Sequence, residues 1–215
     1  AALLRHGDLA MYFAKRRWPG SHAFFDASMN EGMLQRYTIE SKLRGALERG
    51  EFSLHYQPQI EMATGDIAGM EALLRWNSPT RGNVSPGNFI PVAEESGHII
   101  PLGYWVLNEV CLTLRSWQDK GLTLVPVSVN VSARQFQQPD FHKRVAEVLR
   151  KHSIDPSLIE IELTEGLVME DIDSAQRELA QLKKIGLRIS IDDFGTGYSC
   201  LSYLRRFPID VLKID

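Results

Sequence analysis

Two adjacent carboxylates, Asp192 and Asp193, follow a β-branched segment and precede a glycine-containing turn. Alone, this pattern is typical of an ordinary turn after a strand. Other strand-like segments carry polar side chains equally late, where β/α barrel enzymes place catalytic groups. These residues are Glu71, Asn130, Glu162 and Lys213. The repetition favours a functional site over a solvated surface, because central parallel strands have little contact with water.

The possible metal ligands in this set offer only oxygen atoms. They are Glu71, Asn130, Glu162, Asp192 and Asp193. Hard ligands of this kind select Mg²⁺ or Mn²⁺ over zinc. Crowded carboxylates repel one another unless a cation lies among them. The adjacent aspartates could serve two ions about 3.5–4 Å apart, the spacing used in phosphoryl hydrolysis by two metals.

Two cationic side chains, Arg75 and Lys213, lie near these acids in the predicted strands. Both could add positive charge for a phosphate group. For Lys213 a structural ion pair with a neighbouring carboxylate is the alternative. The set as a whole therefore predicts metal-assisted hydrolysis of a phosphodiester.

Strand-like and helical segments alternate from Phe52 onward, which indicates parallel β-α units. One face of each strand is apolar and the other polar, whereas strands of an open doubly wound sheet tend to be apolar throughout. A closed β/α barrel gives the polar faces a common mouth, so we predict an α/β fold of the TIM-barrel type. The expected strands are 52–59, 67–76, 124–131, 158–164, 187–192 and 211–215, and the expected helices are 89–96, 103–120, 138–152, 171–185 and 199–206.

The segment before the barrel has a different character. Residues 4–16 and 29–49 have helical spacing, and 22–25 could form a short strand. The first piece is too small to bury a core of its own. We predict that 1–28 is the remnant of another domain, 29–46 a linker helix and 47–215 the barrel.

Composition excludes several classes of protein. Of the 215 residues, 44% are hydrophobic and 24% are charged, which is ordinary for a soluble globular chain. A net charge of -3 does not suggest a nucleic-acid polymer as a partner. The two cysteines, Cys111 and Cys200, fit a reducing compartment without a disulfide framework. No apolar run approaches the ~20 residues of a membrane span, so we expect a cytoplasmic domain, whose parent protein could still be membrane-anchored.

Seven short motifs follow one another in the predicted barrel. They are YQP at 56–58, EALLR at 71–75, FIPVAE at 89–94, SVNVS at 128–132, ELTE at 162–165, DDFGTGYS at 192–199 and LKID at 212–215. These motifs resemble the signatures of EAL-domain cyclic-di-GMP phosphodiesterases. The resemblance covers roughly residues 35–215, in order and at family-like spacing, and it implies a TIM-like barrel that hydrolyses cyclic-di-GMP to linear pGpG with Mg²⁺ or Mn²⁺.

The resemblance implies catalytic and metal-binding roles for individual residues. Lys213 would position water and phosphate, and Asp193 would help to bind a second metal. The first metal would be bound by Glu71, Asn130, Glu162 and Asp192.

It also implies a substrate-binding set and a regulatory loop. Gln57 would face a guanine and Arg75 would contact a phosphate, with Leu74 and Pro91 also in the substrate-binding set. Glu165 would hold the 193–199 loop, which couples metal binding to dimerisation, so a homodimer through the barrel is expected. Cys200 stands where the family usually has a second serine, and we expect a small effect.

Residues 8–15 resemble the last helix of GGDEF domains, which are diguanylate cyclase-like and often precede EAL domains. This likeness implies a GGDEF or sensory domain upstream in the parent protein. The signature loop of that domain is not in the chain, so no cyclase activity is implied.

The barrel segment is shorter than the family pattern. About 170 residues and six expected strands fall short of the ~250 residues and eight strands of a full barrel. The missing strands would carry a further catalytic glutamate and a guanine-contacting glutamine. We therefore expect a fragment that hydrolyses cyclic-di-GMP poorly, with exposed edges at its first and sixth strands.

Two other functions stay open at this point. A non-catalytic cyclic-di-GMP receptor would keep binding without turnover. An enolase-like enzyme also places acids on three consecutive strands and a lysine on a barrel strand, although Glu71 and the Gln57-Pro58 pair fit it less well.

Overall fold

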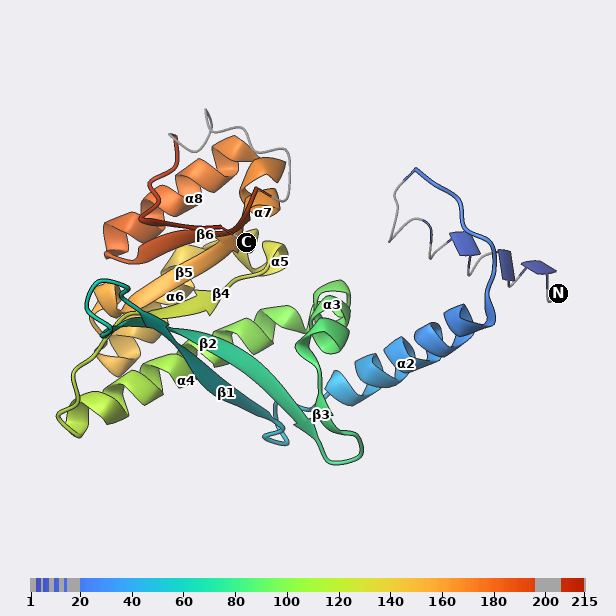
Figure 1. The fold of residues 1–215 in the computed structure, drawn as a ribbon, viewed down its shortest axis with the longest axis horizontal. Helices are drawn as coiled ribbons and strands as arrows, with labels where there is room; N and C mark the ends of the chain where they lie inside the picture. The colour runs from blue at the N-terminus through green and yellow to red at the C-terminus, as the bar shows by residue number, and fades with distance from the viewer. Residues whose placement is uncertain are drawn as a thin grey trace.

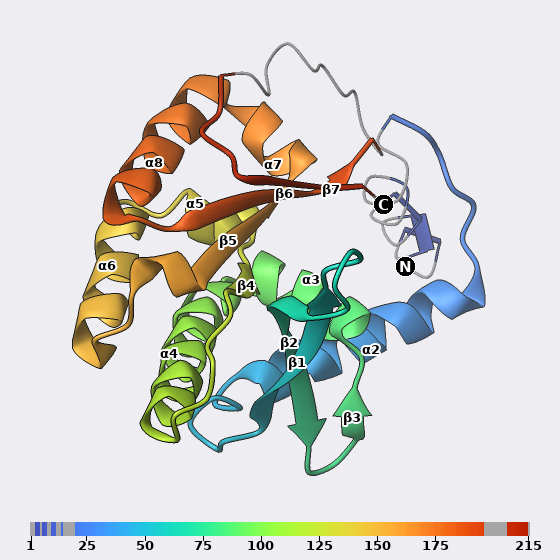
Figure 2. The same ribbon diagram turned by 60° about the vertical axis from the view of Figure 1, so that its left-hand side comes forward.

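A curved sheet with helices along one side forms the centre of the computed structural model (Figures 1 and 2). The structure describes residues 20–195 and 206–214, together with residues 3, 4, 6, 7, 10, 11 and 14. The strands run in the order β1-β2-β4-β5-β6-β7, with β3 beside β2. They are β1 (Phe52–Ile60), β2 (Ile67–Ser78), β3 (Gly82–Val84), β4 (Val127–Asn130), β5 (Ile159–Thr164), β6 (Arg188–Phe194) and β7 (Val211–Ile214).

Helices lie between β3 and β4, between β4 and β5, and between β5 and β6. Pro156–Leu158 adds one 3-10 turn before β5. The α-helices are α2 (Ala27–Leu43), α3 (Pro86–Ser96), α4 (Ile99–Asp119), α5 (Ala133–Phe136), α6 (Phe141–His152), α7 (Glu165–Glu170) and α8 (Ile172–Ile185). The expected helices 89–96, 103–120, 138–152 and 171–185 thus correspond to α3, α4, α6 and α8, whereas the short β3, α5 and α7 were not expected.

The expected parallel pairing is confirmed from β2 to β7 and is wrong for the first two strands. β2, β4, β5, β6 and β7 pair in parallel in that order, whereas β1 and β2 are antiparallel. Only Glu61–Asp66 separates β1 from β2, which suits a hairpin and is too short for the crossover that parallel strands need. Among the described strands β1 and β7 lie at the two ends, so the sheet is open, which agrees with the incomplete α/β barrel predicted from the sequence.

The segment before β1 also differs from expectation. Residues 21–26 form neither helix nor strand, so the short strand expected at 22–25 is wrong. The α2 helix ends at Leu43 rather than Arg49, because Gly45 adopts the left-handed conformation with φ +74°. Arg49 then donates to the carbonyls of Lys42 and Arg44. The expected helices 4–16 and 199–206 lie largely outside the described residues.

Apolar and polar side chains separate onto opposite faces of the central strands, as the alternation predicts. The apolar face forms the main core with α4, α6 and α8, and Val127, Ile161 and Ile189 are all at most 1% exposed. A second core joins α2 and α3 to β1 and β2 around Trp76 and Phe89. The other face of β4–β6 therefore carries the polar residues.

Among the described residues, no helix combines the length and the apolar character that a membrane span requires.

Gly103 in α4 makes room for a buried glutamine of α5, the short helix that follows β4. A Cβ at Gly103 would lie 1.6 Å from Nε2 of Gln135. The Oε1 atom of Gln135 accepts hydrogen bonds from the backbone and hydroxyl of Ser132, which caps α5 two residues after Asn130. The close approach of α4 thus helps to fix the turn that follows Asn130.

Gly103→Ala is predicted to destabilise the chain by about 1–3 kcal/mol, because overpacking would displace Gln135. Within a helix, Gly→Ala usually has the opposite effect and raises the free energy of unfolding by up to about 1 kcal/mol. Urea denaturation of Gly103→Ala and wild type measures the difference. Gly166→Ala in α7 is the control, because nothing lies within 4 Å of its Cβ position. Equal free energies of unfolding for Gly103→Ala and wild type would contradict this account.

Candidate functional site

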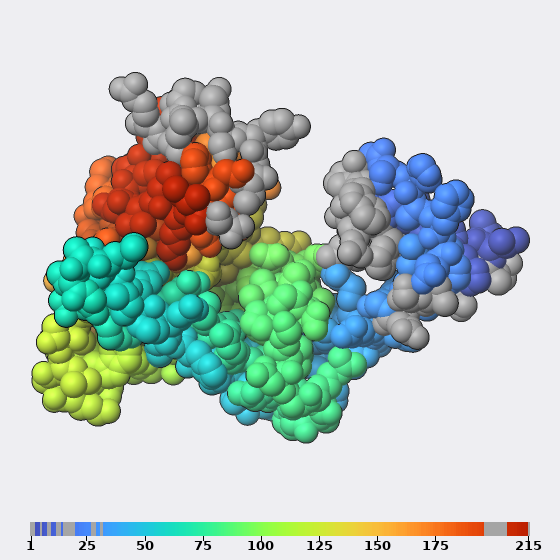
Figure 3. Space-filling model, viewed as in Figure 1, coloured from blue at the N-terminus to red at the C-terminus, as the bar shows by residue number. Residues whose placement is uncertain are grey.

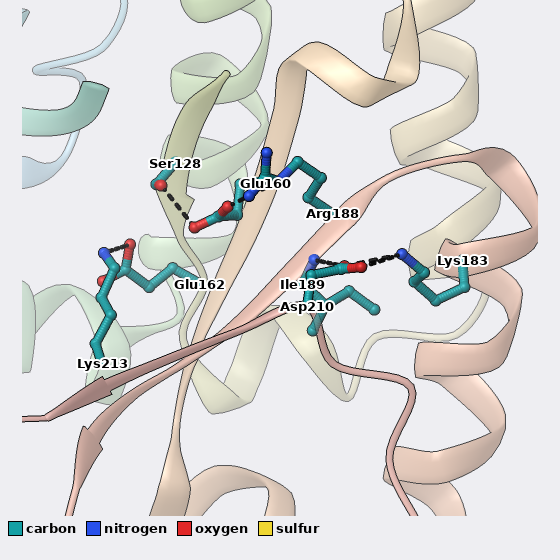
Figure 4. A network of polar contacts seen from close by, with 8 residues as sticks. All are labelled: Ser128, Glu160, Glu162, Lys183, Arg188, Ile189, Asp210 and Lys213. Carbon is teal, nitrogen blue, oxygen red and sulfur yellow. Dashed lines mark hydrogen bonds and ion pairs between the residues drawn. The ribbon is translucent and has the colours of Figure 1, made fainter. Parts of the chain in front are cut away.

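Four of the expected site residues form a chain of polar contacts at the sheet's polar face. Asn130 Nδ2 donates to Glu71 Oε1 at 2.8 Å. Lys213 Nζ lies 3.9 Å from Glu71 Oε2 and forms a closer ion pair with Glu162 Oε2 (Figure 4). The four residues come from β2, β4, β5 and β7, so the parallel register brings together segments that are distant in sequence.

Glu162 is the most buried acid of this group. Its side chain is 1% exposed, and apart from the Lys213 ion pair neither carboxylate oxygen accepts a hydrogen bond from the described residues. Burial raises the pKa of Glu162, the Lys213 ammonium lowers it and the charges of Glu71 and Asp192 raise it, and together these effects bring the pKa to about 7. The negative charges of Glu71 and Asp192 therefore act on Glu162. Lys213 is the positively charged group beside Glu162 and Glu71.

The Asp192–Asp193 pair lies at an irregular point of β6. Asp192 pairs with Thr164 of β5 and is half-buried. Asp193 is exposed and has φ +55°, which is uncommon for a residue other than glycine. The β6–β7 register shifts between Ile191 and Phe194. In a regular strand the two carboxylates would point to opposite faces, so this irregularity relaxes that constraint. Sequence alternation alone gave no sign of it.

Glu165 links α7 to the turn that follows the two aspartates. It is 3% exposed, and its Oε2 accepts a hydrogen bond from the Gly195 backbone at 3.2 Å. Gly195 belongs to the 193–199 loop. Residues 196–199 of the loop lie outside the described residues, as do Cys200 and Asp215.

A pocket of about 630 Å³ opens beside Asn130, and two of the expected substrate-binding residues line it. Leu74 and Arg75 contribute from β2, and Glu94 and Gln135 line it without having been expected. Arg75 Nη1 donates to the carbonyl of Leu74 at 3.0 Å.

The other two expected substrate-binding residues are placed differently. Gln57 of β1 lies directly opposite Glu71 of β2 and is exposed. Pro91 lies inside α3 and is not among the residues that line the pocket. The structure thus brings Gln57 to the site's edge and leaves Pro91 outside the pocket wall.

A second polar network lies on the same face of the sheet. Ser128 donates to Glu160 Oε1 at 2.9 Å, and Arg188 Nε lies 3.3 Å from Glu160 Oε2 (Figure 4). A cavity of about 370 Å³ joins this network to Glu71 and Lys213. Its walls come from the β1–β2 hairpin and from β4–β7, and the hairpin and the C-terminal segment lie next to each other on the surface in Figure 3.

The donor chemistry fits a hard divalent cation. Glu71, Asn130, Glu162 and Asp192 offer only oxygen ligands, and the Glu162 oxygens are buried with a single cationic partner among the described residues. Within those residues, no three Asp, Glu, His or Cys side chains are gathered closely enough to hold an ion. The Lys213 ammonium lies between Glu162 and Glu71.

Glu162→Gln is predicted to stabilise the metal-free chain at pH 8 by about 1–3 kcal/mol, because each pKa unit is worth about 1.4 kcal/mol. The folded pKa of Glu162 exceeds the ordinary value of 4.5, so the folded state binds the extra proton between pH 4.5 and about 7. The stability that this proton binding gives to the folded state is therefore present below pH 4.5 and is lost as pH rises through about 7. Urea denaturation at pH 5 and pH 8, with chelator present, measures the difference.

Glu160→Gln is the matched control, because Glu160 is buried on the same strand and face but has Ser128 and Arg188 as partners. It should destabilise the chain at pH 8. A Glu162→Gln variant less stable than wild type at pH 8 would show that the buried charge is fully compensated.

Comparison with known proteins places this geometry in a family. The model of the EAL domain matches residues 40–215. MucR of Pseudomonas aeruginosa, called a bifunctional diguanylate cyclase/cyclic di-GMP phosphodiesterase, is 44% identical over 99% of this chain. PdeR of Escherichia coli, called a cyclic di-GMP phosphodiesterase, is 42% identical over 100% of it. The chain spans 31% and 32% of the length of these two relatives.

A solved structure has the same fold. The PaMucR phosphodiesterase in its c-di-GMP complex superposes with a TM-score of 0.80 and 46% identity, covering 83% of this chain and 72% of that one. With the motifs, the strand order and the family match in agreement, the chain belongs to the EAL-domain family.

Proposed function

We propose that this chain hydrolyses cyclic-di-GMP to linear pGpG with Mg²⁺ or Mn²⁺ in bacterial second-messenger signalling. Family membership and the activities named for MucR and PdeR support the proposal. The observation that carries it is the run of contacts from Asn130 through Glu71 and Lys213 to Glu162. These contacts bring oxygen donors and the Lys213 ammonium group together on the polar face of the sheet.

Each residue of the site has a proposed task. Glu71, Asn130, Glu162 and Asp192 would hold one cation, and Asp193 would help to hold a second. Bound divalent cations stabilise negative charge on a phosphodiester and lower the pKa of water. Lys213 would leave Glu162 for a phosphate oxygen and orient the attacking water. Water adds to phosphorus, one ester P–O bond breaks, and the leaving sugar oxygen takes a proton.

The surrounding residues would position the substrate. Arg75 would contact a phosphate, Gln57 a guanine, and Leu74 and Pro91 would complete the binding surface. Glu165 would couple the loop after Asp193 to the metal site through its contact with Gly195. The same loop would take part in a homodimer.

We propose that turnover by this 215-residue chain is slow. The sheet is open between β1 and β7 in the described residues, and Lys213 lies on the edge strand β7. Water can therefore reach the site from one side and weaken its electrostatic contacts. The organisation proposed for the chain is 1–28 from a GGDEF-like domain, 29–46 as a linker and 47–215 as the EAL segment, within a cytoplasmic part of the parent protein.

Hydrolysis is predicted to require a divalent cation and Glu71. Purified chain is incubated with cyclic-di-GMP and Mn²⁺, Mg²⁺ or EDTA, and pGpG is quantified by chromatography. We expect pGpG only with metal, at a rate well below the ~1–10³ s⁻¹ of typical enzymes. Glu71→Gln should lower that rate by about 100-fold or more, because a ligand is lost and even outer-shell changes lower activity 10–100-fold.

Glu61→Gln is the control for Glu71→Gln, because Glu61 lies on the exposed β1–β2 turn. Equal pGpG formation in EDTA would contradict the metal-dependent mechanism. Cyclic-di-GMP binding without turnover under every metal condition would favour a receptor instead.

A further inference from the structure

The β7 strand has few features of its own that could fix Lys213 in place. Its register partners on β6 are Ser190, Ile191 and Phe194, with a shift between the last two. Lys213 lies within that irregular part and has no register partner. β7 is also an edge strand of the described sheet. A slip of one residue would turn Lys213 to the opposite face, because side chains alternate along a strand.

Asp210, the residue before β7, forms a clamp on β6. Its backbone N–H donates to the carbonyl of Ile189 at 2.8 Å, and its Oδ2 accepts from the N–H of Ile189 at 2.8 Å. Both polar backbone groups of Ile189 are thus bound by one residue. Lys183 Nζ of α8 lies 2.8 Å from both carboxylate oxygens of Asp210 (Figure 4).

We propose that Asp210 is a positioning residue for the phosphodiesterase reaction: it sets the register of β7 on β6 and so holds Lys213 against Glu162. Asp210 and Lys213 are an odd number of residues apart, so in an extended segment they point to opposite faces. Asp210 accordingly contacts α8 on the helical side, and Lys213 reaches the acids on the polar side. The consequence for catalysis rests on the function proposed above, whereas the consequence for Lys213 placement does not.

The charge of Asp210 suits this task. Burial acts to raise its pKa, but the Lys183 ammonium and the Ile189 N–H outweigh burial, and the pKa is lowered. Asp210 is therefore ionised at neutral pH and keeps its acceptor for Ile189. The side chains of Lys183 and Asp210 are 32% and 33% exposed, so the backbone hydrogen bonds, rather than the ion pair alone, define the register.

The test measures the accessibility of the Lys213 amine in the full chain by reductive methylation and peptide mass spectrometry. In wild type the amine is engaged by Glu162 and should react slowly. Asp210→Ala removes the side-chain acceptor, and Lys213 labelling should rise several-fold. Asp210→Asn keeps an oxygen for Ile189 and should lie between the two. Lys184→Met, the neighbouring exposed position on α8, is the control and should leave Lys213 labelling unchanged.

The outcomes separate this inference from the proposed function. Unchanged Lys213 labelling in both Asp210 variants would overturn the inference, whatever happens to hydrolysis. Increased labelling together with unchanged hydrolysis would support the placement of Lys213 by Asp210 and remove Lys213 from the mechanism. Increased labelling with a lower kcat and little change in KM is the expected result. Should Asp210→Ala fail to fold, Asp210→Asn alone decides, since its labelling must exceed that of wild type.

Discussion

The ion pair between Lys213 and Glu162 is the constraint on which the site depends. An isolated carboxylate in a low-dielectric interior is very unfavourable, so it either protonates or acquires a cationic partner. Glu162 does some of both, with a pKa raised to about 7 and an ammonium group at its side. The edge strand β7 must therefore hold Lys213 beside Glu162. The contacts of Asp210 with Ile189 and Lys183 fix the position of β7.

The core and the site lie on opposite faces of the sheet. The apolar faces of β4, β5 and β6 pack on α4, α6 and α8 and form the main core. The opposite faces carry polar groups, among which the buried Glu160 contacts both Ser128 and Arg188. The buried Glu162 carboxylate has only the Lys213 ion pair as compensation among the described residues. We propose that this arrangement trades some stability for a carboxylate that can exchange its lysine partner for a metal ion.

Much of this arrangement follows from the sequence. Strict alternation predicts that Glu162 shares a face with Glu160, and parallel strands place Asn130 beside Glu162 and carry Glu71 and Lys213 to the same side. Other features depend on backbone geometry that residue patterns do not encode. Asn130 is followed by a cap that needs Gly103 on a distant helix, and Asp193 has a left-handed backbone without being glycine.

Strand direction does not follow from the alternation of polar and apolar residues, because alternation is the same in parallel and antiparallel strands. Only the short connection of residues 61–66 distinguishes β1–β2 as a hairpin. The anchoring role of Asp210 depends on two hydrogen bonds to the backbone of Ile189, one from its own N–H and one to its carboxylate, and Ile189 lies 21 residues earlier in the chain. The early end of α2 depends likewise on the φ of Gly45 and on the carbonyl contacts of Arg49.

We propose that the buried Glu162 carboxylate is a metal ligand whose charge is balanced by Lys213 in the absence of a divalent cation. Electron paramagnetic resonance of Mn²⁺ titrated into the chelator-treated chain is a direct test, because free and bound Mn²⁺ give different signals. We predict saturable binding that is weakened by more than about tenfold in Glu162→Gln and unchanged in Glu160→Gln. Equal Mn²⁺ affinity in wild type and Glu162→Gln would contradict the account.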